Sequence, residues 1–407
     1  MLTVAEAQSR VLARVSRAHG VSVPLMDALG RNTSTEVLSP MDLPPWDNSS
    51  MDGYAVRAED LAGHETVLRL NEVIAAGSWP SFSVESGTAS AIMTGAPMPL
   101  GADAVVMVED TDGALEGKVA IRANPEKGSY VRKKGEEIRA GDALVPAGTL
   151  LTAAHLGLLA SVGCTTVNVA PRPRVGILST GDEVVLPGSP LAPGQIYSAN
   201  NATLSALTLE AGAEAIDAGQ VPDRLEDLLD RLEMLLSCDV ILTSGGVSVG
   251  AFDVVKQVFE CLHGEVDFWR VKMKPGKPLA FGHLQRPDGS PVPLFGLPGN
   301  PVSCAVNFHQ FVRPWLRKRM GDPRPFLPEI EAITDHPFRE RPGRECYLRV
   351  SLEIRHGQWF CRSAGSQSSA GLPGLAAAHG YLVLPAESHG AAQGERVRVQ
   401  VFNSAIR

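Results

Sequence analysis

The stretch Val240-Ile-Leu-Thr-Ser-Gly-Gly-Val-Ser-Val-Gly250 joins a short apolar, β-branched run to a glycine-rich loop, and the carboxylate Asp253 follows it. The apolar run predicts a buried strand that ends at the loop. A glycine loop between a strand and a helix offers free backbone N–H groups beside a positive helix dipole, which suits an anion such as phosphate. A plain turn remains the alternative, because the stretch contains neither GxxxxGK[ST] nor a full GxGxxG.

The sequence on both sides of this loop alternates between strand and helix patterns. The predicted strands cover residues 175–178, 215–217, 240–243, 265–268, 279–282 and 294–297. The predicted helices cover residues 202–211, 225–236, 253–262 and 303–318. Such alternation is typical of a parallel-rich sheet with helices on both faces. We therefore expect a three-layer α/β/α domain over residues 173–322.

The remaining sequence predicts three further domains. Residues 41–140 contain short β-like runs between glycine turns, which indicates a β-rich domain. Residues 323–407 have similar short strands and predict a C-terminal β-barrel-like domain. Residues 1–40 and 141–172 predict a small helical or mixed domain, beginning with a helix from Thr3 to about Ala18 that Thr3 and Glu6 cap. Four domains are compatible with 407 residues.

Composition excludes several functional classes. The net charge is -8, from 45 acidic and 37 basic residues, which argues against a general nucleic-acid surface. Six cysteines are scattered without a CxxC pair, so we expect reduced thiols rather than zinc ligands or disulfides. The N-terminus has no signal-peptide pattern and no stretch of 18 uncharged apolar residues occurs, so we expect a cytoplasmic protein with no membrane partner.

Polar residues gather in four loops that follow strands of the predicted α/β domain. The loops are Ser179-Thr-Gly-Asp-Glu183, Ser244 to Asp253, Lys272-Met-Lys-Pro-Gly-Lys277 and Leu297-Pro-Gly-Asn-Pro-Val-Ser303. In the last loop, Asn300 is expected to be the N-cap of a helix with Pro301 at its first position. Ligands of open α/β sheets bind outside the carboxyl ends of the strands, so we expect these loops to form one site.

The residue types in these loops favour phosphoryl or oxyanion chemistry. Lysines and helix N-termini suit an oxyanion, while Asp182, Glu183 and Asp253 suit Mg²⁺. Neither a GxSxG elbow nor an HExxH motif is present, which disfavours covalent hydrolases and zinc proteases. His309 lies in an apolar helix and is interpreted as a core or interface residue.

Six motifs in order resemble the molybdopterin molybdenumtransferase family, which includes the C-terminal domain of gephyrin. They are Pro44-Pro-Trp-Asp-Asn-Ser-Ser-Met-Asp-Gly-Tyr-Ala-Val56, Ile92-Met-Thr-Gly-Ala-Pro97, Ser179-Thr-Gly-Asp-Glu183, Ser244-Gly-Gly-Val-Ser-Val-Gly250, Lys274-Pro-Gly-Lys-Pro278 and Leu297-Pro-Gly-Asn-Pro-Val-Ser303. The similarity runs from about Val4 to the C-terminus. Trp46 stands where phenylalanine is commoner, and Glu137 stands at a usual aspartate position.

The resemblance implies a Mg²⁺-dependent transferase that converts adenylylated molybdopterin and molybdate into molybdenum cofactor and AMP. It also implies an elongated homodimer in which the β-rich domain of the partner completes the cleft. Further implied partners are the adenylyltransferase of the preceding step and chaperones of molybdoenzymes. The alternatives are a dimeric scaffold on the same fold, or the adenylyltransferase itself.

The resemblance also implies roles for individual residues. Catalytic roles fall on Asp52, Thr94, Glu183, Asp223, Asp253 and Lys274, and the metal would be held by Glu183, Asp223 and Asp253. Substrate-binding roles fall on Thr180, Gly181, Asp182, Ser244, Gly245, Gly246, Ser248, Lys277, Pro298, Gly299, Asn300, Ser303, Arg344, Ser368 and Ser369. Arg344, Ser368 and Ser369 would enter the site from the C-terminal domain.

Overall fold

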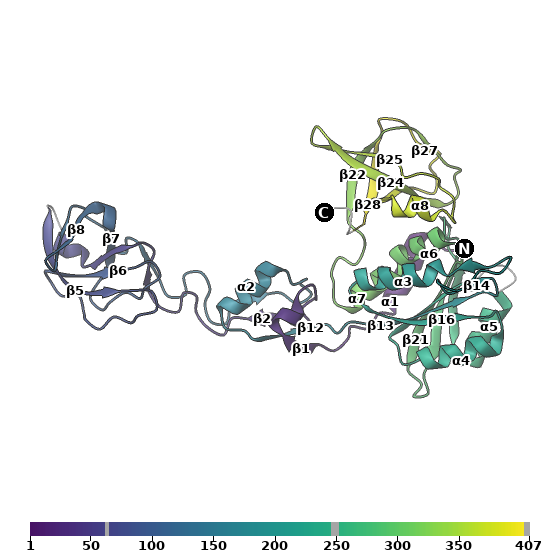
Figure 1. The fold of residues 1–407 in the computed structure, drawn as a ribbon, viewed down its shortest axis with the longest axis horizontal. Coiled ribbons are helices and arrows are strands. Elements are labelled where there is room, and N and C mark those ends of the chain that lie inside the picture. Colours follow the sequence, from purple (N-terminus) through teal and green to yellow (C-terminus); the bar gives the residue numbers. More distant parts are fainter. Residues whose placement is uncertain (62–64, 246–251, 403–407) are drawn as a thin grey trace.

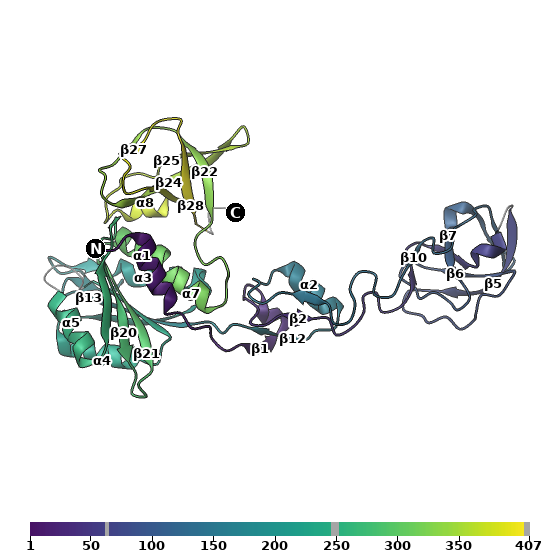
Figure 2. The same ribbon diagram turned by 180° about the vertical axis from the view of Figure 1, so that it is seen from behind.

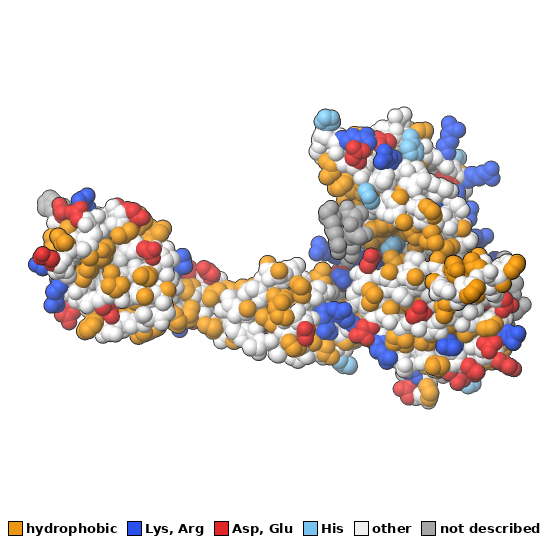
Figure 3. Space-filling model, viewed as in Figure 1, with side chains coloured by type: hydrophobic (Ala, Val, Ile, Leu, Met, Phe, Trp, Pro, Cys, Tyr) orange, Lys and Arg blue, Asp and Glu red, His pale blue; other side chains and the backbone are white. Residues whose placement is uncertain are grey.

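The structure, a computed structural model, describes residues 1–61, 65–245 and 252–402, without the side chains of residues 252–256. The chain is elongated (Figures 1 and 2). A β-rich module lies at one end, a small mixed module follows it, and the α/β region lies at the other end with the C-terminal barrel beside it. Acidic and basic side chains are interspersed on the face seen in Figure 3.

The α/β region is built on a six-stranded sheet with the order β16-β13-β17-β21-β20-β18. Its strands are β13 (Arg174–Thr180), β16 (Glu214–Val221), β17 (Val240–Ser244), β18 (Glu265–Arg270), β20 (Pro278–Gln285) and β21 (Pro291–Leu297). The first four strands in the order pair in parallel, whereas β20 is antiparallel to both of its neighbours. The predicted parallel-rich sheet is therefore confirmed.

Helices cover both faces of this sheet. One face carries α1 (Val4–Ala13), α3 (Ala199–Glu210), α6 (Pro301–Asn307) and α7 (Arg313–Arg319). The other carries α4 (Leu225–Leu235) and α5 (Phe252–Cys261). Apolar side chains of each helix set share a core with one face of the strands, as Leu204 of α3 does with Ile177, and Leu232 of α4 with Ile241. The three-layer α/β/α arrangement is thus confirmed.

The strand order reverses beside β13. The chain leaves β13 through α3 to reach β16 on one side, then returns through α4 to β17 on the other side. Because α3 and α4 lie on opposite faces, a crevice opens at the carboxyl ends of β13 and β17. Thr180 ends one of these strands and Ser244 ends the other.

The C-terminal region forms a closed five-stranded barrel. Its strands are β22 (Glu329–Thr334), β24 (Glu345–Arg355), β25 (Gln358–Ser363), β26 (Gly380–Leu384) and β28 (Arg396–Val401). They pair in the ring β24-β25-β22-β28-β26, and β26 pairs again with β24. The short strand β19 (Met273–Lys274), from the loop after β18, joins the edge of β24. Strands β23 (Phe338–Arg339) and β27 (Gly390–Ala391) form a separate pair, and α8 covers Leu372–Ala376.

The β-rich module contains another six-stranded sheet, with the order β7-β4-β6-β5-β9-β8. Its strands are β4 (Gly53–Val56), β5 (Thr66–Ile74), β6 (Thr88–Ile92), β7 (Ala104–Met107), β8 (Thr111–Leu115) and β9 (Lys118–Ile121). A short pair, β3 (Asn48–Ser49) with β10 (Val131–Arg132), adjoins it. Leu68, Val106 and Ile121 are among the buried residues of its core. The β-like runs predicted for this part are confirmed as strands.

The small mixed module lies between the β-rich module and the α/β region (Figure 1). It consists of β1 (Val21–Pro24) paired with β12 (Thr166–Val169), β2 (Val37–Leu38) paired with β11 (Ala143–Val145), the 3₁₀ helix η1 (Leu25–Ala28) and α2 (Ala153–Ser161). The predicted domain limits group residues 1–40 with this module and stay a prediction. In the structure, however, α1 packs in the α/β core through Val4, Ala7 and Val11.

Two predicted helices differ from the observed ones. The first keeps its capping box between Thr3 and Glu6 but ends at Ala13 instead of Ala18. The helix expected over 303–318 is interrupted by a π-helical turn, η4 (Phe308–Val312). That turn carries two buried polar residues, His309 and Gln310, which hydrogen-bond Tyr381 and Gln400 of the barrel. The π turn provides a local change of helix geometry where these polar contacts form.

Two expectations from composition can be compared with the structure. All six cysteines are free thiols; four are buried, whereas Cys164 is partly exposed and Cys261 is exposed. In the part of the chain that the structure describes, every helix is too short or too polar to cross a membrane.

Candidate functional site

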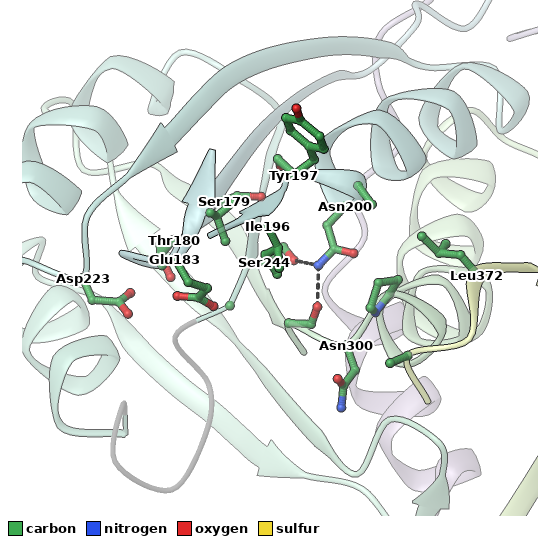
Figure 4. Close-up of a pocket in the computed structure, with 18 residues that line it drawn as sticks. Ser179, Thr180, Glu183, Ile196, Tyr197, Asn200, Asp223, Ser244, Asn300 and Leu372 are labelled. Atoms are coloured by element: carbon green, nitrogen blue, oxygen red, sulfur yellow. Dashed lines mark hydrogen bonds between the residues drawn. The ribbon is translucent and has the colours of Figure 1, made fainter. Parts of the chain in front are cut away.

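A pocket of about 630 Å³ lies at the crevice between the ends of β13 and β17 (Figure 4). The pocket is lined by the strand ends, by the starts of α3 and α6, and by part of the barrel. The lining residues are Ser179, Thr180, Gly181, Glu183, Val184, Ile196, Tyr197, Ser198, Ala199, Asn200, Asp223, Ser244, Gly245, Gly299, Asn300, Pro301, Ala370 and Leu372. Three of the four predicted loops therefore meet here.

The loop after β13 requires a glycine at position 181, because any other residue would be strained there. Gly181 has φ +144°, and a Cβ there would lie 2.8 Å from Glu183 Oε2. Gln220 Nε2 donates to the Gly181 carbonyl at 2.8 Å. The Asp182 carboxylate accepts a hydrogen bond from the Asp223 backbone N–H at 3.3 Å. Asp182 thus joins the two acidic loops rather than lining the pocket.

The loop after β17 approaches the first loop closely at Gly245. This residue has φ +95°, and a Cβ would lie 2.5 Å from the Thr180 carbonyl oxygen. Only glycine allows the two strand ends to approach in this way. Gly246 and Ser248 lie outside the described residues, as does the side chain of Asp253 in the first turn of α5. The glycine loop from which the phosphate prediction began is therefore described only through Gly245.

Two carboxylates lie at one end of the pocket. Figure 4 shows Glu183 and Asp223 there, with Asn300 and Leu372 at the opposite end. Carboxylate oxygens are hard donors of the kind that Mg²⁺ prefers. Among the described residues, no group of three His, Cys, Asp or Glu side chains converges as a metal site. The predicted set of Glu183, Asp223 and Asp253 fits a magnesium ion in donor chemistry, and its role stays a prediction.

Several polar atoms of the pocket lack partners inside the protein. Thr180 Oγ1, Ser198 Oγ and Asn200 Oδ1 are buried and form no hydrogen bond in the structure. Buried polar atoms are rarely left without a partner. These residues also line the pocket, so the arrangement favours a polar ligand over an apolar one.

The start of α6 is held by a loop of the barrel. Asn300 is the N-cap residue and Pro301 the first helical residue, as predicted. The Asn300 side chain, however, does not cap the helix; its Nδ2 donates to Ser369 Oγ at 3.2 Å. The Val302 N–H donates to the Ser369 carbonyl at 3.1 Å. Ser369 is thus brought to the rim, and Ala370 beyond it lines the pocket.

A buried arginine shapes this barrel loop. Arg349, on β24, is 1% exposed. Its Nη1 donates to the Ser368 carbonyl at 2.9 Å and its Nη2 donates to the Ser366 carbonyl. Gln367 bonds the Arg349 backbone in both directions, with its Oε1 accepting at 3.0 Å and its Nε2 donating at 2.9 Å. The loop that reaches the pocket is therefore anchored inside the barrel.

The lysine turn does not line the pocket and instead contacts α6 and the barrel. Lys274 forms an ion pair with Glu340 of the barrel, with 2.6 Å between Nζ and Oε2. Lys277 is exposed, before β20. Asn307 Nδ2, on α6, donates to the Gly276 carbonyl at 3.1 Å and so attaches the turn to α6. Ser303 is 4% exposed in the same helix.

The other predicted residues are placed as follows. Pro298 follows β21 without lining the pocket, and Arg344 and Ser368 are exposed on the barrel. Asp52 and Thr94 form a local pair, in which the Thr94 N–H donates to Asp52 Oδ1 at 2.7 Å and its Oγ1 at 3.0 Å. These two hydrogen bonds lower the pKa of Asp52. Both residues lie in the β-rich module, far from the pocket of the same chain (Figure 1).

The structure adds lining residues that the motifs did not single out. Ile196, Tyr197, Ser198, Ala199 and Asn200 come from β15 (Ile196–Tyr197) and the start of α3. They follow β14 (Val184–Val185), which pairs in parallel with β15. The sequence Ser198-Ala-Asn-Asn201 before an apolar helix carries a helix-start signal that could have indicated them.

Comparisons with known proteins agree with this architecture. Residues 2–163 match the family described as MoeA N-terminal region (domain I and II), residues 176–318 match the probable molybdopterin binding domain, and residues 331–402 match the MoeA C-terminal region (domain IV). A solved MoeA protein from Pyrococcus horikosii superposes with a TM-score of 0.85 and 32% identity, covering 99% of each chain.

Two curated relatives match over nearly the whole length. Molybdopterin molybdenumtransferase 2 of Mycobacterium tuberculosis is 40% identical over 98% of this chain and 99% of its own. Molybdopterin molybdenumtransferase of Haemophilus influenzae is 36% identical over 100% of both chains. The chain belongs to the molybdopterin molybdenumtransferase family, a family of transferases.

Proposed function

We propose that this protein inserts molybdenum during molybdenum cofactor biosynthesis, converting adenylylated molybdopterin and molybdate into molybdenum cofactor and AMP. The observation that carries the proposal is the composite pocket. Hydroxyl and amide groups line its centre, two carboxylates lie at one end, and a barrel loop closes the other. The full-length relatives support the assignment of the reaction class.

Neutral and acidic residues of the pocket would bind different parts of the substrate complex. Thr180, Ser244 and the loop at Gly245 would bind the nucleotide phosphate, because hydroxyl and backbone N–H groups suit phosphate oxygens. Glu183, Asp223 and Asp253 would hold Mg²⁺, which when bound neutralises phosphate charge.

The molybdate would lie beside the lysine turn. Lys274, Lys277 and Ser303 follow the motif of the family, and Asn307 fixes the turn next to α6. Positive charge and hydroxyl groups suit a tetrahedral oxyanion. Arg344, Ser368 and Ser369 of the barrel would complete this side of the site.

The functional unit would be a cytoplasmic homodimer. Asp52 and Thr94 lie far from the pocket of their own chain, so they can serve the reaction only at the pocket of a second copy. Functional partners would be the enzyme that supplies adenylylated molybdopterin and the chaperones that receive the finished cofactor.

Purified protein with adenylylated molybdopterin, molybdate and Mg²⁺ tests the proposal. We expect AMP release that depends on molybdate, with a loss of about 2–4 kcal/mol of transition-state stabilisation in Asp223→Ala or Lys274→Ala. Asp288→Ala, in an exposed turn outside the pocket, is the matched carboxylate control. Consumption of ATP with molybdopterin would indicate the adenylyltransferase instead, and tight protein binding without turnover would indicate a scaffold.

A further inference from the structure

Asn200 joins two of the loops that form the pocket. It is the second residue of α3, and its Nδ2 donates to Ser244 Oγ at 2.6 Å and to the Gly299 carbonyl at 2.8 Å (Figure 4). A carbonyl oxygen can only accept, so the amide NH₂ must face Gly299. The same NH₂ then reaches Ser244, and the orientation of the Asn200 amide is set by its surroundings. Ser244 must therefore accept from Asn200.

A second group also donates to the Ser244 hydroxyl. Cys304 Sγ, on α6, lies 3.9 Å from Ser244 Oγ. Burial raises the pKa of Cys304 to about 12, so the thiol keeps its proton at neutral pH. A serine hydroxyl has two acceptor positions and one proton. With Asn200 and Cys304 at the acceptor positions, the hydroxyl proton remains available to donate.

The proton of the Ser244 hydroxyl has no acceptor among the described residues. Within the described residues, the hydrogen bonds of Ser244 Oγ are those it accepts. Ser244 is 2% exposed and lines the pocket, so an oxygen of a ligand bound there can accept this proton. A phosphate oxygen is such an acceptor, and a hydrogen bond to a charged oxygen is stronger than one to a neutral group.

We propose that Asn200 is a positioning residue that makes the Ser244 hydroxyl a hydrogen-bond donor, so that this part of the pocket selects a phosphate oxygen of the ligand. The inference deepens the proposed function and rests on it for the identity of the nucleotide. Asn200 acts through Ser244 and does not need to touch the ligand itself.

A double-mutant cycle tests this coupling in the full-length protein. The binding of AMP in the presence of Mg²⁺ is measured by calorimetry for wild type, Asn200→Ala, Ser244→Ala and the double variant. We expect each single variant to weaken binding about tenfold, because a hydrogen bond to a charged oxygen loses its donor or its alignment. The double variant should be no weaker than Ser244→Ala, because coupled residues are not additive.

The cycle separates positioning from a structural role. If Asn200 mattered only by holding the Gly299 loop, its effect would add fully to that of Ser244→Ala, and this result would overturn the proposal. Asn168→Ala, on the exposed face of β12, should leave both AMP affinity and the melting temperature unchanged.

The remaining outcomes distinguish a failure of this inference from a failure of the proposed reaction. Wild-type protein that binds neither AMP nor inorganic phosphate would overturn the inference, because the pocket would then hold no oxyanion. A coupled cycle without molybdate-dependent AMP release would support the inference while contradicting the proposed reaction. Equal AMP affinity of Asn200→Ala and wild type would contradict the inference and leave the reaction untouched.

Discussion

Glu340 places its carboxylate 2.6 Å from the ammonium of Lys274, and the pair joins the barrel to the lysine turn. The Lys274 side chain is 44% exposed and that of Glu340 is 10% exposed. Strand β19, which ends at Lys274, is also hydrogen-bonded to β24 of the barrel. The lysine predicted to bind molybdate is therefore already paired with an acid from another part of the chain.

Removal of this acid should change oxyanion binding. In Glu340→Gln, molybdate no longer competes with a carboxylate, so we expect its apparent KM to fall by up to about fivefold, the range of a partly exposed ion pair. Steady-state AMP release at varied molybdate measures the effect. Asp267→Asn, which breaks the pair with Arg10, is the control and should leave this KM unchanged. A higher KM in Glu340→Gln would mean that the acid orients Lys274.

The close approach of the two strand ends should be sensitive to one methyl group. Gly245→Ala adds a Cβ that would lie 2.5 Å from the Thr180 carbonyl oxygen at φ +95°. Gly188→Ala is matched in backbone, with the same φ of +95° and no atom within 4 Å of its Cβ. We expect a cost of about 1 kcal/mol in Gly188→Ala and of about 2–4 kcal/mol in Gly245→Ala, measured by urea unfolding. Equal losses would show that the loop relaxes.

The stability of the protein should fall in mild acid through His309. Burial, with a smaller contribution from the nearby charge of Arg313, lowers the pKa of His309 from 6.5 to about 3. Between these values the unfolded chain binds a proton that the folded chain does not. The free energy of unfolding should therefore fall by about 1.4 kcal/mol per pH unit as the pH drops below 6.5.

Replacement of His309 separates its contribution to the pH dependence of stability from the contributions of other groups. His309→Gln keeps an acceptor for the Tyr381 hydroxyl, which lies 3.1 Å from His309 Nδ1. Urea unfolding at pH 7 and pH 5 should show a smaller difference in this variant than in wild type. Burial also lowers the pKa of His283, so part of the dependence should remain. Exposed His389→Gln is the control, and an unchanged slope in His309→Gln would contradict the prediction.

The barrel loop at the pocket should depend on the guanidinium of Arg349. A lysine ammonium at this position cannot reach both the Ser366 and the Ser368 carbonyls in the same fork geometry. We expect Arg349→Lys to lose about 2–3 kcal/mol in unfolding free energy, because one loop carbonyl loses its hydrogen bond to the charged guanidinium. Arg396→Lys, at an exposed pair with Glu331, should cost less than about 1 kcal/mol.

Mixed dimers test whether Asp52 serves the pocket of a second copy. Asp52→Ala and Asp223→Ala should each be inactive alone. If both are dissociated, mixed in equal amounts and reassociated, half of the dimers are mixed and each has one intact site, so about a quarter of wild-type activity should return. AMP release before and after mixing measures this recovery. Activity that stays at the level of the separate variants would show that the residues act within one chain.

Local patterns in the sequence were sufficient to predict the layers of the α/β region. Alternating apolar runs and amphipathic segments predicted the sheet of the α/β region, because burial of one face imposes its period on the chain. They did not predict that β20 runs antiparallel to its neighbours or that a π turn interrupts the helix after Asn300. Both features depend on packing partners far along the chain, which no local period records.

The sequence by itself determined which strand ends carry the chemistry, because parallel strands bring Thr180, Ser244 and Gly299 to one edge of the sheet. Only the tertiary structure decided what each side chain does there. It paired Lys274 with Glu340, brought Ser369 to Asn300, and placed the Asn200 amide between two loops. Each of these contacts joins residues more than 40 positions apart, and their geometry is set by packing between layers rather than by neighbours in the chain.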